Sequence, residues 1–389
     1  MSGHGRGPGG LRLCLVGLAS SIALLAAACA GPAPRDPRST VVPPSAQRRE
    51  STSPAPTPAT PPGHVLMQGL VNAGAAFVDN YLYVWQQVTP LGASIHSELW
   101  RIDPITGQVL ARTLLGNFGL GPASDQLLIA NGSLWVAAAG PAGAHVARGG
   151  VLRFQPKTLK ATGTTILTNR GAGQETAALA GGWVWVTDGG TLYKLSPADG
   201  QVAKIITLGT ADQSQVTTNA RGTVLIVAEA DNGFGTIQSR NPTSGALIVT
   251  TRPGILGVTA PTLSEVSGGG VWASVATGMQ GYLEHLEVTT IRPTPLSLPY
   301  PGDATNGISA QIMSGVLYVQ QIDGGPTRNY CGNPSNGQML APLGLGPAST
   351  VLAADSTDLF YVPVVWYAGP SPARGEELVS LPINTNCRT

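Results

Sequence analysis

The sequence contains few charged and few aromatic side chains. Charged residues make up 11% of the chain and aromatic residues 5%, and the 22 Lys and Arg residues almost balance the 21 Asp and Glu residues. A protein that binds nucleic acid through its phosphates needs a field of positive charge. The composition therefore excludes a nucleic-acid partner, and the polar surface must be built from Ser, Thr, Asn, Gln and Gly.

Sustained helical periodicity is also missing. No long segment repeats its apolar residues every three or four positions, whereas Gly occurs 51 times and Pro 32 times. Frequent turn residues between short apolar runs are typical of all-β chains. We expect no helical domain, and residues 64–389 are numerous enough to form one large domain with a sizeable core.

The sequence does contain a repeated strand pattern. At seven places an apolar or aromatic residue lies in a predicted strand that is followed by another strand. Neighbouring places are about 40 to 50 residues apart. The seven markers are Tyr83, Trp135, Trp185, Leu225, Trp272, Tyr318 and Phe360. This repetition predicts a seven-bladed β-propeller of four-stranded antiparallel blades over residues 64–389.

Tight turns recur in step with these markers. Segments 103–107, 196–200, 241–245 and 333–337 each have Pro in the second position and Gly in the fifth. Pro presets φ for a turn, and Gly takes the positive φ that brings the chain back. The last blade has no chain left for a fourth strand, and an open edge invites aggregation. We therefore predict that residues within 64–70 pair beside 378–381.

The N-terminal segments are expected to lie outside this domain. In residues 1–28, Arg6 and Arg12 precede an apolar run that ends in small residues, as in a secretory signal. Residues 25–29 resemble a bacterial lipoprotein box, which implies that Cys29 is lipidated and anchors the chain to the extracytoplasmic face of the cell membrane. An ordinary signal peptide with an incidental Cys is the alternative. Residues 29–63 are rich in Pro, Ser and Thr and predict a disordered tether.

Two cysteines are left for the predicted propeller. Cys14 belongs to the signal and Cys29 to the lipid site, which leaves Cys331 and Cys387. Outside the cytoplasm two remaining thiols are expected to form a disulfide. A reduced or metal-binding pair is the alternative.

Polar residues gather where the inner strands of the blades are expected to begin. Counting back from the markers gives the candidate ligand-binding residues Asn72, Ser124, Asp125, Gln174, Glu175, Ser214 and Gln215. Such groups suit an uncharged or weakly charged ligand at the mouth of the central channel. The alternative is that channel-lining positions are wet in any propeller.

Long loops are predicted on the same face, at residues 87–98, 140–149 and 366–376. They bring five further candidates to one side of the ring: His96, His145, Trp366, Tyr367 and Arg374. Loops on a rigid scaffold often carry binding residues, although insertions without a function are the alternative. His96 and His145 have no evident third ligand, so we expect no metal site.

The clearest repeat, around Trp185 and onward to Gly209, resembles the YVTN repeat of bacterial surface propellers and the related quinoprotein (PQQ-like) repeats. The resemblance implies a seven-bladed propeller, often extracellular, whose repeat residues are structural. No cofactor-contacting residues of quinoproteins are identified, so we expect no cofactor.

Three functions remain open at this point. The first is a monomeric, membrane-anchored module that binds a protein, peptide or glycan on the channel-loop face. The second is a propeller enzyme of the lactonase, lyase or quinoprotein type at the channel mouth. The third is a structural component of the cell envelope. The few acidic residues available near the channel favour binding over catalysis.

Overall fold

The computed structural model describes most of residues 63–387. The described ranges are 63–71, 73–88, 96–120, 126–140, 149–167, 175–209, 213–231, 234–251, 262–264, 267, 269–277, 280–290, 292–293, 307–322, 327–345, 349–363 and 376–387. The predicted signal, the lipid site at Cys29 and the tether lie outside these residues.

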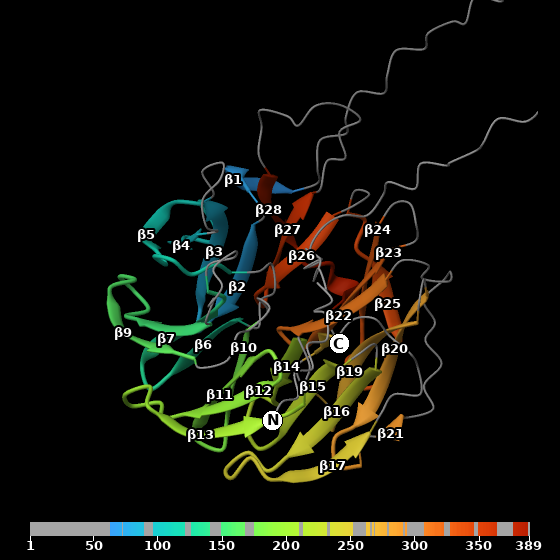
Figure 1. Cartoon of the computed structure of the whole chain (residues 1–389). Coiled ribbons are helices and arrows are strands. Elements are labelled where there is room, and N and C mark those ends of the chain that lie inside the picture. The colour runs from blue at the N-terminus through green and yellow to red at the C-terminus, as the bar shows by residue number, and fades with distance from the viewer. Residues whose placement is uncertain are drawn as a thin grey trace, which may run out of the picture. The chain divides into compact units, whose positions relative to one another are not determined.

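The described strands form seven four-stranded antiparallel sheets (Figure 1). The first six sheets meet one after another through their first strands. The sixth meets the seventh through β24 (Thr327–Gly332) and β26 (Ser349–Ala354), and the seventh meets the first through β26 and β2 (Gly74–Val78). This arrangement is a β-propeller, as the repeat pattern predicts. Among the described residues, one helical segment is longer than a single residue, the 3-10 turn Thr385–Cys387. No helix in this part of the chain is long and apolar enough to cross a membrane.

Each blade uses four strands, ordered below from the centre of the ring outward. Blade 1 contains β2 (Gly74–Val78), β3 (Tyr81–Val88), β4 (His96–Ile102) and β5 (Val109–Leu114). Blade 2 contains β6 (Leu127–Ala130), β7 (Ser133–Ala138), β8 (Gly150–Phe154) and β9 (Ala161–Ile166). Blade 3 contains β10 (Thr176–Ala180), β11 (Trp183–Asp188), β12 (Thr191–Leu195) and β13 (Val202–Thr207). Blade 4 contains β14 (Gln213–Thr217), β15 (Leu225–Asp231), β16 (Phe234–Arg240) and β17 (Leu247–Thr251).

The remaining blades follow the same order. Blade 5 contains β18 (Thr262–Leu263), β19 (Gly270–Thr277), β20 (Gln280–Glu287) and β21 (Arg292–Pro293). Blade 6 contains β22 (Gly307–Met313), β23 (Val316–Ile322), β24 (Thr327–Gly332) and β25 (Met339–Pro342). Blade 7 contains β26 (Ser349–Ala354), β27 (Asp358–Pro363), β28 (Glu376–Pro382) and, outermost, β1 (His64–Leu70).

The N-terminal strand closes the ring, as the strand count predicts. In blade 7, β1 pairs antiparallel with β28, so that His64 lies opposite Ser380 and Leu70 opposite Glu376. Leu66 and Leu70 are buried in a cluster that also contains residues of blade 1. The Glu376 carboxylate accepts a hydrogen bond of 2.8 Å from the backbone N–H of Ala73. The closing strand is therefore held by main-chain pairing and by apolar contacts.

The repeated aromatic residues and the repeated turns meet across the blade interfaces. Three markers donate a hydrogen bond to the carbonyl of the Pro in the turn of the next blade: Tyr83 Oη to Pro156 (3.1 Å), Trp185 Nε1 to Pro242 (3.0 Å) and Trp272 Nε1 to Pro334 (2.8 Å). The last Gly of the turn packs against the same ring. A Cβ atom at Gly337 would lie 2.4 Å from Cη2 of Trp272. The two sequence repeats therefore reflect one repeated contact between neighbouring blades.

The assignment of Leu225 as the marker of blade 4 is wrong by one residue. The other markers face the following blade, but Leu225 is packed in a cluster with Trp185 and Ala178 of the preceding blade. Ile226 faces blade 5, in a cluster with Val271 and Leu286. Successive side chains of a strand point to opposite faces, so a shift of one residue changes the blade that a side chain contacts.

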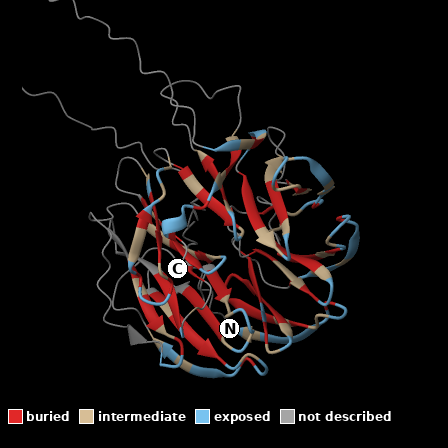
Figure 2. Ribbon diagram, turned by 180° about the vertical axis from the view of Figure 1, so that it is seen from behind, coloured by how far each residue is buried: buried red, intermediate tan, exposed pale blue. Residues whose placement is uncertain are grey.

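Burial decreases from the centre of the ring to its rim (Figure 2). The second strands are almost entirely buried, whereas the outer strands β5, β9 and β13 are largely exposed. Both faces of the second strands pack against neighbouring blades, as Val136 and Trp135 do in two different clusters, which explains their near-continuous apolar runs. Along part of the outer strands β5 and β9, exposed and partly buried residues alternate.

A disulfide joins the C-terminal turn to blade 6. Cys331 on β24 and Cys387 are bonded, with their Cα atoms 5.6 Å apart, and both residues are fully buried. The structure thus contains the bridge that the sequence predicts.

Candidate functional site

Most of the candidate ligand-binding residues lie outside the described part of the chain. This holds for Asn72, Ser124, Asp125, Gln174, His145, Trp366, Tyr367 and Arg374. The backbone of His96 begins β4 opposite Val88. The role of these residues stays a prediction, and so does the clustering of the long loops. Glu175, Ser214 and Gln215 are the candidates whose side chains the structure describes.

Ser214 and Gln215 use their side chains to join neighbouring blades, and Gln215 also lines the channel cavity. The Ser214 hydroxyl donates to the carbonyl of Gly189 in blade 3. Gln215 Oε1 accepts a hydrogen bond of 2.8 Å from the backbone N–H of Leu263 in blade 5. In the same way, Thr176 Oγ1 accepts from Val216 N of blade 4 at 2.8 Å. Polar residues near the beginning of the inner strands therefore hold consecutive blades together.

Glu175 belongs to a pair of buried carboxyl groups between blades 2 and 3. It directly precedes β10, where Thr176 lies opposite Thr187, so Glu175 comes level with Asp188 at the end of β11. Glu175 is 1% exposed and Asp188 0%. A Cβ atom at Gly149 of blade 2 would lie 2.8 Å from Glu175 Oε1 and 3.2 Å from Asp188 Oδ2. The two oxygens are therefore within about 6 Å of each other, close enough for their charges to interact.

The environment of this pair favours the protonated forms. Burial raises the pKa of Glu175 to about 8, and the negative charge of Asp188 acts in the same direction. Burial also raises the pKa of Asp188, to about 7. Neither carboxylate oxygen of Glu175 has a hydrogen-bond partner in the described part of the chain. Carboxyl groups with raised pKa values occur at functional sites more often than elsewhere.

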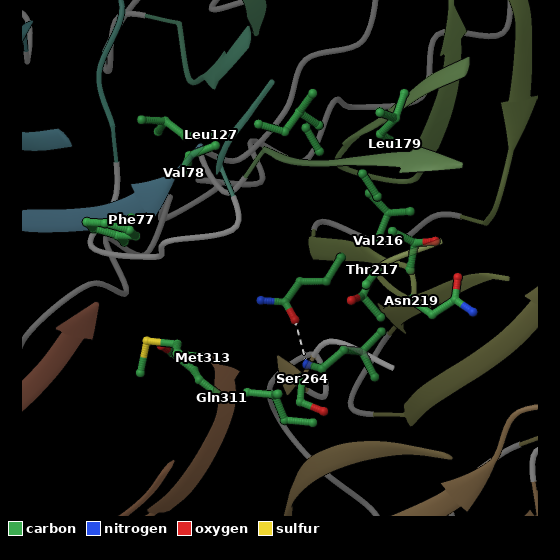
Figure 3. A pocket seen from close by; sticks show the side chains of 18 of the residues that line it. Phe77, Val78, Leu127, Leu179, Val216, Thr217, Asn219, Ser264, Gln311 and Met313 are labelled. Carbon is green, nitrogen blue, oxygen red and sulfur yellow. Dashed lines mark hydrogen bonds between the residues drawn. The ribbon is translucent and has the colours of Figure 1, made fainter. Parts of the chain in front are cut away.

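The central channel is a separate candidate site. Its cavity has a volume of about 640 Å³ and lies among the inner strands β2, β6, β10, β14, β18 and β22. Figure 3 shows aliphatic and aromatic side chains along this wall, among them Phe77, Val78, Leu179 and Met313. Leu179 is 37% exposed. The described wall of the channel is therefore lined mainly by apolar groups, and the polar mouth expected from the sequence stays a prediction.

A few polar groups interrupt this apolar wall. Gln311 lies beside Met313 on β22, and its Oε1 atom is buried with no hydrogen-bond partner among the described residues. Asn219 is bonded within its own turn, to the backbone N–H and hydroxyl of Thr223. Thr217 and Gln215 complete the polar part of the lining in blade 4. An apolar cavity with a few polar groups is the usual composition of a ligand site.

The sequence pattern does not predict the pairing of Asp188 with Glu175 or the close approach of Gly149 to both. Asp188 ends an apolar strand and is easily taken as part of the following turn, because Gly189 and Gly190 come next. The pair Gly149–Gly150 is one sequence signal of this close packing. Neither glycine has a positive φ, and a Cβ atom at either position would lie very close to another side chain. In the described ranges no group of three His, Cys, Asp or Glu residues is placed to hold a metal ion.

Comparisons with known proteins add little to this geometry. No protein-family model matches the chain, and no curated protein matches it. One similar solved structure is described as "Structure of Dos1 propeller"; it is 13% identical, with 77% of this chain and 75% of that chain covered and a TM-score of 0.46. The resemblance to YVTN and PQQ-like repeats stays a prediction. The function must be argued from the channel and the carboxyl pair themselves.

Proposed function

We propose that this protein is a binding module that holds a peptide segment of a partner protein in the central channel of its propeller. The observation that carries the proposal is the cavity of about 640 Å³, whose wall is mainly aliphatic. Ligand sites have volumes of about 300 to 1,000 Å³ and combine apolar walls with few polar groups. The channel falls in this class by volume and by composition.

A peptide suits this wall better than a sugar does. Leu179, Met313 and Phe77 offer partly exposed apolar area for an apolar side chain. Gln311 Oε1, which has no hydrogen-bond partner among the described residues, is an acceptor that suits a main-chain N–H group. Sugar rings usually pack on Trp or Tyr, and the channel lining contains neither among its described residues.

The test is a selection of random displayed peptides on the full-length protein. Leu179→Arg places a long cation inside the channel and is expected to abolish binding of the selected peptides. Ile205→Arg is the matched control, because Ile205 is an exposed aliphatic residue of the outer strand in the same blade. Equal binding to wild type and Leu179→Arg, or loss with Ile205→Arg only, would contradict the proposal.

We further propose that the module is anchored to the extracytoplasmic face of a membrane through lipid on Cys29. The support is the signal-like segment 1–28 and the box at 25–29. Cys29→Ala is expected to move the protein from the membrane fraction to the soluble fraction. Retention of the variant in the membrane fraction would refute the anchor.

A second candidate function is a propeller enzyme that works beside the channel. The Glu175–Asp188 pair favours it, because two carboxyl groups with raised pKa values can supply a general acid and a general base. Turnover of a lactone substrate that is lost in Glu175→Gln would support this function over binding alone.

A further inference from the structure

We propose that Glu175 and Asp188 bind a hard metal cation of the calcium type between blades 2 and 3. Nothing in the peptide-binding proposal requires this site, and either proposal can fail without the other.

Both carboxyl groups face blade 2. On β11, Val184 and Val186 pack against Trp135 and Val151 of that blade. Asp188 follows Val186 by two residues and so points to the same side, because side chains alternate along a strand. Thr187 points to the opposite side, where its hydroxyl donates to the carbonyl of Ser214 in blade 4. The contact of Gly149 with both carboxyl groups agrees with this placement.

The site places two carboxyl groups together where water is excluded. Glu175 is 1% exposed, its two oxygens lack hydrogen-bond partners among the described residues, and the Asp188 carboxyl lies beside it. A buried charge is stable only when it is paired, bound to a metal or neutralised by a proton. A bound cation would neutralise the unpartnered Glu175 carboxylate and lie within reach of Asp188.

The donor atoms indicate the class of cation. Carboxylate oxygens are hard ligands and suit Ca²⁺, Mg²⁺ or Mn²⁺ rather than soft metals. Two carboxylates do not complete a coordination shell, and Ca²⁺ accepts additional backbone carbonyl and water oxygens in irregular geometry. Calcium is therefore the probe that fits the site best.

Gly149 gives the site its space. A side chain at this position would lie against both carboxyl groups, where the ion is expected. The next residue, Gly150, is equally constrained, because a Cβ atom there would lie 2.5 Å from the ring of Phe118. The close approach of the backbone to Glu175 explains why glycine is found at position 149.

The experiment is titration calorimetry of the full-length protein with CaCl₂ at about pH 8, after treatment with a chelator. One calcium ion per chain is expected to bind, and Glu175→Gln and Asp188→Asn are each expected to weaken binding roughly tenfold or more. Glu229→Gln is the matched control. Glu229 is a buried carboxyl of blade 4 that is already bonded to Gln238 Nε2, so this variant is expected to bind calcium as wild type does.

A second measurement is thermal unfolding of the wild-type protein. Calcium is expected to raise its thermal midpoint at about pH 8. The proposal is overturned by the absence of saturable calcium binding to wild type, by a thermal midpoint that calcium leaves unchanged, or by equal binding to wild type and to folded Glu175→Gln.

Discussion

Replacement of Glu175 by Gln is expected to stabilise the metal-free protein at neutral and alkaline pH. The pKa of this carboxyl is raised from 4.5 to about 8. Between these two pH values the folded protein binds more protons than the unfolded chain does. Stability therefore falls as pH rises through this window. Asp188 has the same sign, because its pKa is raised from 3.8 to about 7.

The size of the effect follows from the raised pKa. A tenfold change in proton affinity corresponds to about 1.4 kcal/mol. At pH 7 the ionisation of Glu175 in the unfolded chain therefore favours unfolding by on the order of 3 kcal/mol. Gln has the shape of the protonated Glu side chain and no charge to desolvate. The variant should gain most of this free energy at about pH 8 and little at about pH 5.

The assay is urea unfolding in the presence of a chelator, followed by Trp fluorescence at several pH values between 5 and 9. Wild type is expected to lose stability with rising pH, and Glu175→Gln is expected to lose much less. Glu229→Gln should show no comparable gain at alkaline pH, because Glu229 already accepts a hydrogen bond from Gln238. A wild-type stability that rises from pH 5 to 8, or a Glu175→Gln variant less stable than wild type at pH 8, would refute the reasoning.

Three further predictions concern the contacts that hold the ring together. Leu70→Ala removes a buried side chain of the closing strand and should cost about 2 to 5 kcal/mol; an unchanged thermal midpoint would count against closure by β1. Cys387→Ser opens a loop of 56 residues and should cost about 4 kcal/mol, with proteolysis beginning at the C-terminal strand; cleavage that begins elsewhere would contradict this. Gly337→Ala forces Trp272 to move and should cost about 1 to 3 kcal/mol more than Gly269→Ala. Gly269 also has a positive φ, but there is open space around its Cβ position. Equal losses would mean that the blade contact is unimportant.

Much of the fold can be predicted because each blade carries its own local signals. Aromatic strand residues such as Trp185 recur with Pro-Gly turns such as 241–245, and the structure shows that the two are in contact. The closing strand follows from counting strands in blade 7, since an unpaired edge is costly. The repeat pattern places blade 4 one residue out of register, because Leu225 and Ile226 are both aliphatic and hydrophobicity alone does not distinguish the two faces of a fully buried strand.

The candidate site is less accessible to sequence reasoning. The repeat register identifies Glu175, but its partner Asp188 is 13 positions away and is brought beside it only by the register of the β10–β11 hairpin. The same register predicts a ligand-binding role for Gln215, which lines the channel and also joins blade 4 to blade 5 through its Oε1 atom. Whether a polar residue near a strand start bonds a ligand or the next blade depends on the distance between inner strands. That distance is a property of the whole ring and is not encoded in any one repeat.

Hydrogen–deuterium exchange with and without a selected peptide tests the central claim, that the channel is the binding site, most directly. Slower exchange is expected in the inner strands β6, β10, β14 and β22, whose residues line the cavity, with no change in the outer strands β5, β9 and β13. Protection confined to the outer strands, or exchange that the bound peptide leaves unchanged in all inner strands, would contradict the claim.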